Sequence, residues 1–386
     1  MLFQNFIRTN HDIIQANESD FDFLDRCAWP KAKQIRLLLE QCLNNYPVTE
    51  KLEIIARLKS GDHRQFTSTT FELLLHEYLV YQDFILSPHP ELANGSSKRP
   101  DFLVTCPDGQ QFYLEAICTS ENNGKNDSAE ALKDSTLDYL NSRPHKNFVL
   151  SINSSGDPIT QPSGKKLYSI IKTWLDSLDP DIVLADSENN GYSSFPEISW
   201  AHEEWKVIIE AIPLAVKHRG THKQLIGIQN YDASWINSWI PIRDAIQKKT
   251  NRYGQLDLPL IVAVNINSFK LNPIDEMQAL FGEEQFSFNL ASLDNPHFSR
   301  VSNGAWFGPA GPKGKRCSAA WLFGNLSIYS LTNIDHTLYI NPWSTLPIPS
   351  SALIMPNAKV EGHQLKLMEG KSFKDIFNLS KGWPDE

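Results

Sequence analysis

Hydrophobic residues recur every three to four positions in two segments near the start of the chain, 31–44 and 48–59. This spacing predicts two helices, which Pro47 and Gly61 end. The segments carry no residue pattern typical of a catalytic site. We therefore expect residues 1–64 to form a helical cap that either packs on the rest of the chain or binds a partner.

The segment 66–86 is apolar around most of the circumference of a helix, which predicts a largely buried helix. Ser68, Thr69 and Thr70 offer N-capping side chains at its start. Glu72 lies in the expected first turn, where the helix dipole favours an acidic residue. That position gives Glu72 an ordinary structural explanation beside any functional one.

The rest of the chain alternates between helical and strand-like patterns, which predicts an α/β protein with a mixed or parallel sheet. The stretch 179–200 is polar and is expected to be a surface excursion. The region 271–386 is expected to be a C-terminal accessory region with irregular, aromatic-rich segments from residue 290 onward. The predicted helices are 128–141, 164–178, 240–253 and 372–378, and the predicted strands are 147–152, 205–214 and 258–267.

Two strand-like runs, 101–106 and 110–118, flank the sequence Pro107-Asp108-Gly109. Proline suits the first central position of a type I turn, aspartate the second, and glycine the left-handed position that follows. This pattern predicts a β-hairpin with a three-residue loop and a glycine bulge.

The loop fixes the register of the hairpin. If Cys106 and Gln110 flank it, Asp101 lies directly across from Glu115, and cross-strand partners on one face have Cβ atoms roughly 5 Å apart. A two-residue loop would place the two side chains on opposite faces. The turn chemistry therefore predicts a pair of neighbouring carboxylates.

Two adjacent carboxylates repel each other and need compensation, which a divalent cation provides well. The alternative is a pair of exposed acids on a solvated sheet face, and Asp101 at the start of its strand suits that interpretation. Glu115 suits it less, because it interrupts the apolar run 112–117. Both interpretations stay open on the residues alone.

The order of Glu72 on a helix, Pro100-Asp101 at the start of a hairpin strand, and Glu115 on the next strand resembles the PD-(D/E)XK, or restriction-endonuclease-like, nuclease superfamily, in an uncharacterised bacterial branch. The resemblance covers about residues 66–155. It implies a nuclease core over 65–270, a mixed β-sheet flanked by helices. It also implies metal-dependent hydrolysis of phosphodiester bonds, with DNA as the expected substrate and defence or repair as the expected role.

The resemblance implies site residues as well. Asp101 and Glu115 would hold Mg²⁺, with Mn²⁺ as an alternative, and Glu72 would bind a second ion or orient a metal-bound water. Lys98 and Arg99 would contact phosphate, and Lys98 would also serve in catalysis.

One departure from the family pattern stands out, because the lysine expected two positions after Glu115 is Ile117. That lysine orients the attacking water and offsets charge on the phosphate. Lys98 and Lys133 are candidates to replace it, Lys125 is a poorer one, and His76 could act as a base instead. Each of them also has an ordinary surface or packing explanation.

A locally basic helix gives further candidates for nucleic-acid binding, Lys248, Lys249 and Arg252, to which we add Lys133. The alternative for these residues is a solvated helix face. A basic loop, 311–316, could close on a nucleic-acid backbone or be an ordinary loop.

Composition limits the class of protein. The chain has 386 residues and a net charge of −9, so it lacks an overall basic surface, although a local basic groove remains compatible with that charge. Its five cysteines have no CxxC spacing, and the longest apolar run is too short for a membrane helix. We expect a cytoplasmic protein without membrane contact, as a homodimer, with a partner protein, or alone.

The functional alternatives belong to different classes. The first is the nuclease, and the second is a catalytically inactive nuclease-like module that binds nucleic acid or a partner, which Ile117 favours. A third is an enzyme of unrelated chemistry that shares only the α/β sheet.

Overall fold

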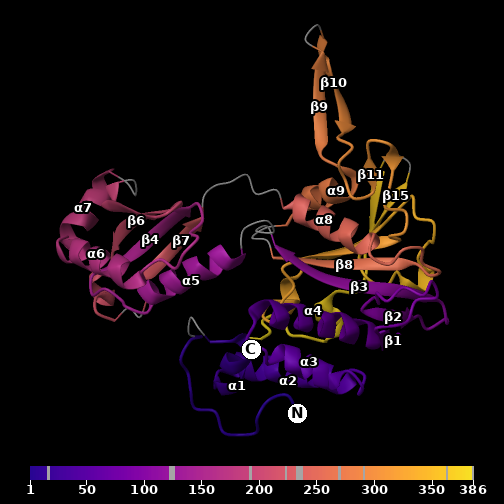
Figure 1. The fold of residues 1–386 in the computed structure, drawn as a ribbon, viewed down its shortest axis with the longest axis horizontal. Coiled ribbons are helices and arrows are strands. Elements are labelled where there is room, and N and C mark those ends of the chain that lie inside the picture. The colour runs from indigo at the N-terminus through magenta and orange to yellow at the C-terminus, as the bar shows by residue number, and fades with distance from the viewer. Residues whose placement is uncertain are drawn as a thin grey trace. The chain divides into compact units, whose positions relative to one another are not determined.

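The computed structural model describes residues 1–14, 18–120, 127–190, 194–221, 224–231, 238–267, 271–289, 292–361 and 364–384. The chain forms two compact units, shown in Figure 1. Unit 1 contains residues 1–123 and 237–386, and unit 2 contains residues 124–236. Unit 2 is thus an insertion in the sequence of unit 1, and the segments 1–64, 65–270 and 271–386 expected from the sequence do not coincide with these units.

Unit 1 is built on an eight-stranded mixed sheet in the order β1-β2-β3-β8-β13-β14-β15-β16. The first three strands form an antiparallel meander, β3 and β13 pair with β8 in parallel, and antiparallel and parallel pairs alternate beyond them. The strands are β1 (Ile85–Pro88), β2 (Phe102–Thr105), β3 (Gln111–Ser120), β8 (Leu260–Asn267), β13 (Ala319–Gly324), β14 (His336–Ile340), β15 (Asn357–Glu361) and β16 (Gln364–Met368).

Helices flank both faces of this sheet (Figure 1). Alternate strand residues such as Leu114 and Ile261 pack with the N-terminal helices and α10, whereas Tyr113 and Val262 pack with α8 and α9. The helices are α1 (Asp20–Arg26), α2 (Pro30–Asn45), α3 (Lys51–Leu58), α4 (His63–Val80), α8 (Trp239–Thr250), α9 (Pro273–Phe281) and α10 (Phe373–Ile376). The predicted α/β class and the mixed sheet flanked by helices are therefore confirmed.

Two hairpins outside the main sheet also belong to the described part of unit 1. They are β9 (Glu284–Asn289) with β10 (Ser292–Arg300), and β11 (Phe307–Gly308) with β12 (Gly311–Pro312).

Unit 2 has its own four-stranded sheet, in the order β5-β6-β4-β7, and its own hydrophobic core. Helices α5, α6 and α7 contribute apolar side chains to that core. The elements are α5 (Asp127–Asn141), β4 (Phe148–Ser155), α6 (Gly164–Asp176), α7 (Pro180–Asn190), β5 (Glu197–His202), β6 (Trp205–Pro213) and β7 (Ile226–Tyr231).

Three local predictions need correction. The polar stretch 179–200 lies at the surface as expected, but it forms α7 and the first part of β5, because a surface helix and an edge strand need only a partly apolar face. The region from residue 290 onward supplies four regular strands to the main sheet. Helix α4 is capped by Asp62, whose side chain accepts hydrogen bonds from the backbone N–H groups of Arg64 and Gln65, so the candidates for the cap at 68–70 lie inside the helix.

Candidate functional site

The hairpin has the register that its turn predicts. Phe102 pairs with Leu114 and Thr105 with Gln111, so Asp101 lies opposite Glu115, one step beyond the last pair. In the loop, the Gly109 N–H donates to the carbonyl of Cys106 at 2.9 Å, and Gly109 has a φ of +85°. The prediction of a three-residue loop with a left-handed glycine is confirmed.

The surroundings of Asp101 change its pKa. Burial and the neighbouring Glu115 raise its pKa to about 7, with a smaller contribution from Glu72. One of its oxygens, Oδ2, accepts a hydrogen bond of 2.6 Å from the backbone N–H of Ala116. Asp101 therefore lies close enough to Glu115 and to Glu72 to interact electrostatically with each of them.

Glu115 is only 1% exposed and is held by groups from α8 and the residues that follow it. The Lys249 ammonium and the Tyr253 hydroxyl both donate to its carboxylate. A guanidinium nitrogen of Arg252 lies 3.8 Å from Oε1 of Glu115. Burial, followed by the charge of Glu115, raises the pKa of Tyr253, so its hydroxyl stays a hydrogen-bond donor.

Glu72 lies on α4 and is 4% exposed. The Tyr46 hydroxyl donates to its Oε1 at 2.5 Å, and the Arg57 guanidinium donates to its Oε2 at 2.8 Å. Glu72 and Glu115 thus each have a cation and a tyrosine as partners. Asp101 has a backbone N–H as its hydrogen-bond donor, and this bond lowers its pKa by less than burial and Glu115 raise it.

His76 is a buried core residue on α4. Its ring lies 4.7 Å from that of Tyr46 and 5.8 Å from that of Phe102, measured between centroids. Burial lowers the pKa of His76 to about 4, so the imidazole is neutral near pH 7. Among the described residues, its Nδ1 has no hydrogen-bond partner.

Among the described contacts, the cations on Glu115 are Lys249 and Arg252, and the lysine candidates named from the sequence have other surroundings. Lys98 is exposed on the segment between β1 and β2, and Arg99 there pairs with Glu91 at 2.8 Å. Lys133 lies on α5 of unit 2, where its ammonium is 2.6 Å from Asp157. Lys125 is outside the described residues.

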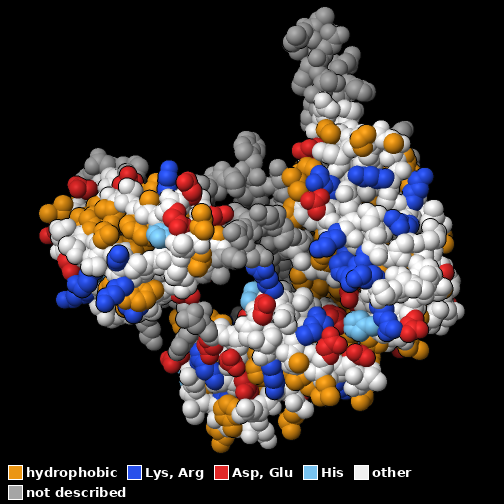
Figure 2. Space-filling view, in the orientation of Figure 1, with side chains coloured by type: hydrophobic (Ala, Val, Ile, Leu, Met, Phe, Trp, Pro, Cys, Tyr) orange, Lys and Arg blue, Asp and Glu red, His pale blue; other side chains and the backbone are white. Residues whose placement is uncertain are grey.

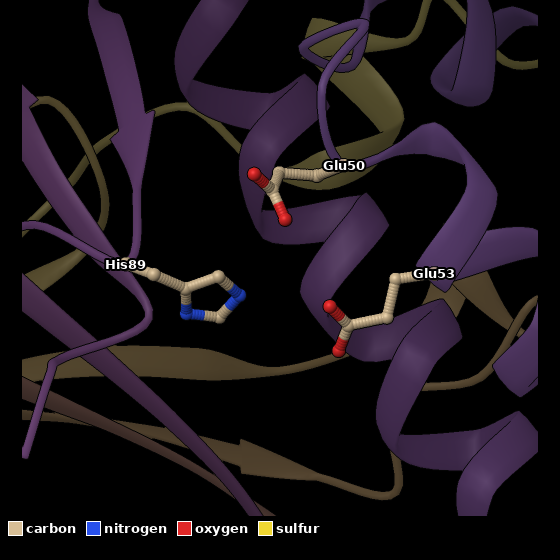
Figure 3. A group of neighbouring side chains, drawn as sticks. All are labelled: Glu50, Glu53 and His89. Atoms are coloured by element: carbon tan, nitrogen blue, oxygen red, sulfur yellow. The ribbon is translucent and has the colours of Figure 1, made fainter.

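A second group of possible metal ligands lies beside the acid pair. Figure 3 shows the imidazole of His89 directed toward the carboxylates of Glu50 and Glu53. Their ligand atoms all lie within 4.8 Å of one another, and the backbone N–H of His89 donates to the backbone carbonyl of Asp101 at 3.0 Å. Imidazole and carboxylate groups are ligands that divalent cations accept. No sequence pattern indicated this cluster, because His89 follows β1 and the two glutamates lie at the start of α3.

Lysine and arginine side chains gather on the face of unit 1 around α8 (Figure 2). Lys248 and Arg252 are exposed there, and Arg316 donates to the side chain of Asn251 at 2.7 Å. The pKa of Lys313 is lowered, first by burial and to a smaller extent by the nearby charge of Arg243. We call the following six residues the basic face: Arg243, Lys248, Arg252, Lys313, Arg316 and the partly buried Lys249.

Sequence reasoning placed Lys249 among candidate nucleic-acid contacts and missed its contact with Glu115. It also missed Tyr46, Arg57 and Tyr253. The basic composition of the helix was the only available signal, since contacts between distant elements leave no local pattern.

No protein-family model, curated protein or solved structure matched the chain. Within the described parts of the chain, no helix is both long and apolar enough to cross a membrane.

Proposed function

We propose that this protein is a metal-dependent nuclease with a restriction-endonuclease-like core that hydrolyses phosphodiester bonds, with DNA as the substrate to test first. One observation carries the proposal. Asp101 and Glu115 are neighbours across the β2–β3 hairpin, where Glu115 is buried and Asp101 is half-buried, and their proximity contributes to raising the pKa of Asp101 to about 7. The helix that bears Glu72 and the mixed sheet flanked by helices are also what the resemblance implies.

The residues at this site fit a divalent cation. Asp101 is a half-buried carboxyl without a cationic hydrogen-bond partner among those described, and carboxylate oxygens are the ligands that Mg²⁺ prefers. Asp101 and Glu115 would hold Mg²⁺ or Mn²⁺, and Glu72 would orient a water at its edge. When bound, the ion supplies an activated water and neutralises charge on the leaving oxygen.

Lys249 supports the catalytic form of the proposal. The family lysine is replaced by Ile117 in the sequence, but the Lys249 ammonium reaches the same acid from α8. A cation in this position can orient water and stabilise the negative charge that develops on the phosphate. We therefore assign to Lys249 the role that the sequence assigned to Lys98 or Lys133.

The basic face supports a polyanionic substrate. Its cations lie on α8, directly after α8 and in the loop that follows β12, and those of them that are exposed are Lys248 and Arg252. Phosphate contacts from such residues give affinity without sequence preference and weaken as salt rises. A net negative chain can present such a local surface.

The alternative is a nuclease-like module that binds nucleic acid without cutting it. It is favoured by the partners of Glu115, since Lys249 and Tyr253 already satisfy this carboxylate and could exclude an ion. In that case the charge of the acids is balanced by the protein itself.

Purified protein incubated with plasmid DNA and linear DNA separates these two functions. We expect cleavage with Mg²⁺ or Mn²⁺ and none in EDTA, and Asp101→Ala should abolish cleavage while leaving DNA binding in Ca²⁺ intact. Salt-sensitive binding without cleavage in any cation would support the inactive module. Neither binding nor cleavage of DNA or RNA would contradict both.

A further inference from the structure

A pocket of about 520 Å³ opens in unit 1, in the size range of sites for small organic ligands. Three aromatic side chains form much of its wall. The rings of Phe307 and Trp343 lie 5.8 Å apart with 35° between their planes, and Phe281 lies 6.1 Å from Trp343. The remaining lining residues are Met277, Arg300, Val360, Gln364 and Leu365.

The pocket has a polar edge that is fixed in place. The Arg300 guanidinium donates to the Gly282 carbonyl at 2.8 Å and lies 2.8 Å from a carboxylate oxygen of Glu284. Aromatic walls with a few oriented polar groups suit a planar ring that also carries hydrogen-bonding atoms.

The pocket adjoins the basic face through the β11–β12 hairpin. Phe307 pairs with Pro312, and Lys313 follows directly. A Cβ atom at Gly308 would meet the stem of Lys313 at 3.0 Å, so this lysine folds back over the strand that bears Phe307. The backbone N–H of Lys313 donates to the carbonyl of Trp306 at 2.8 Å, which fixes the hairpin.

The same cations continue toward the acid pair. The charge of Arg243 acts on Lys313, and Arg243 precedes Lys249 by six residues on α8, which is about 9 Å of helix. The Arg243 side chain is fixed by the ring of Trp239 and by Asp244. Within unit 1, the cations Lys313 and Arg243 therefore lead from the aromatic pocket toward the acid pair.

We propose that the pocket defined by Phe281, Phe307 and Trp343 binds an unpaired nucleobase of the nucleic acid substrate, whose phosphates lie along Lys313 and Arg243 toward Asp101 and Glu115. This inference rests on the proposed function for the identity of the polymer. A base in a duplex is stacked on both faces and cannot enter a pocket, so the substrate class is a single strand, a frayed end or a flap.

The experiment measures binding in Ca²⁺ or EDTA, so that it does not depend on cleavage. Fluorescein-labelled single strands and blunt duplexes of equal length are titrated with the full chain, followed by anisotropy. We expect the single strand to bind more tightly than the duplex, and Trp343→Ala to weaken the single strand about tenfold, as loss of one stacked base does. The duplex affinity should change little.

Two further variants guard against a folding effect. Leu365→Trp fills the pocket without removing a side chain and should weaken the single strand to the same extent. Trp200→Ala, in unit 2, is the matched control and should leave both affinities unchanged. An abasic position is then moved along the strand. At one position it should lower the affinity of the wild type about tenfold and leave the affinity of Trp343→Ala unchanged.

The outcomes separate this inference from the nuclease. Cleavage of DNA together with unchanged strand affinity in both pocket variants would overturn the base pocket alone. If the variants lose affinity for the single strand and the wild-type protein cuts no DNA, the base pocket would be supported and the nuclease function would be contradicted. A mononucleotide that binds as tightly as the strand would assign the pocket to a free nucleotide and overturn the inference.

Discussion

The Lys249 ammonium contacts the carboxylate of Glu115, although the two residues are 134 positions apart in the sequence. Glu115 is 1% exposed and Lys249 is 12% exposed, so the pair is largely removed from water. Removing one member of such a pair leaves a buried charge without compensation, which typically costs about 3–5 kcal/mol. Any test of Lys249 in catalysis must therefore separate its chemistry from its effect on stability.

Replacing Lys249 with Met should lower both cleavage and the melting temperature. We expect the cleavage rate to fall by at least about 100-fold, the range for loss of a group that moves or orients a proton. The double variant Lys249→Met with Glu115→Gln should recover stability, because no buried charge is left unpaired, but it should not recover cleavage. A single variant that cuts at the wild-type rate would remove Lys249 from the proposed mechanism.

Lys133→Met is expected to lower stability without lowering the cleavage rate of the folded protein. Lys133 is 5% exposed and pairs with Asp157 within unit 2, so its loss should lower the free energy of unfolding by about 1–3 kcal/mol. The folded fraction should still cut DNA at close to the normal rate. Lys98→Ala, at an exposed position, should change stability by less than about 0.5 kcal/mol and cleavage only a few-fold. A selective loss of cleavage in either variant would return the catalytic role to that residue.

The elements predicted correctly are those encoded locally. The hairpin register follows from Pro107-Asp108-Gly109 alone, because turn geometry sets it before any distant contact forms. The strands of residues 319–324 and 336–340 were not identified, because their apolar runs lack strict alternation. They are buried on both faces in the middle of the sheet, where a strand does not alternate between apolar and polar residues.

The proximity of the candidate acids could be predicted in part for the same reason. Asp101 and Glu115 are partners across a hairpin, and Glu72 lies on the preceding helix, so three acids come from one local segment. The partners that stabilise them, Arg57 and Lys249, come from α3 and α8. Which cation reaches a given acid is decided by the packing of these helices on the sheet, and a single sequence carries no pattern for that packing.

Mn²⁺ should raise the melting temperature of the wild type, because a ligand that binds only the folded protein stabilises it by about 2.7 kcal/mol at a concentration of 100 Kd. Asp101→Asn should remove this shift. His89→Ala is the control, since His89 belongs to the neighbouring cluster with Glu50 and Glu53 (Figure 3). Loss of the shift in His89→Ala and its persistence in Asp101→Asn would place the ion in that cluster.

Gly109→Ala should destabilise the protein through its backbone alone. Gly109 has a φ of +85°, and a Cβ atom added there would meet nothing within 4 Å. The expected loss is therefore the cost of a left-handed conformation, about 1–2 kcal/mol for an ordinary residue. Gly109→Asn should lose less, because asparagine tolerates this region better. Equal denaturation midpoints for the three proteins would show that the turn does not limit stability.

Glu276 should make the stability of unit 1 depend on pH. It lies on α9, where burial raises its pKa to about 7, and the Tyr339 hydroxyl donates to it at 2.6 Å. The folded protein thus keeps the proton that an unfolded chain, with an ordinary glutamate pKa of about 4.3, releases.

The direction of this pH dependence follows from which state, folded or unfolded, binds more protons. The contribution of Glu276 is fully present below about pH 4.3, decreases as pH rises, and is lost above about pH 7, where the folded carboxyl also ionises. Glu276→Gln should remove this decrease, and its stability relative to wild type should grow between pH 5 and about 7, measured by urea denaturation. Glu369→Gln changes an exposed acid and is the matched control, which should follow the wild-type curve. Parallel curves for wild type and Glu276→Gln across this range would mean that Glu276 ionises alike in the folded and unfolded chain.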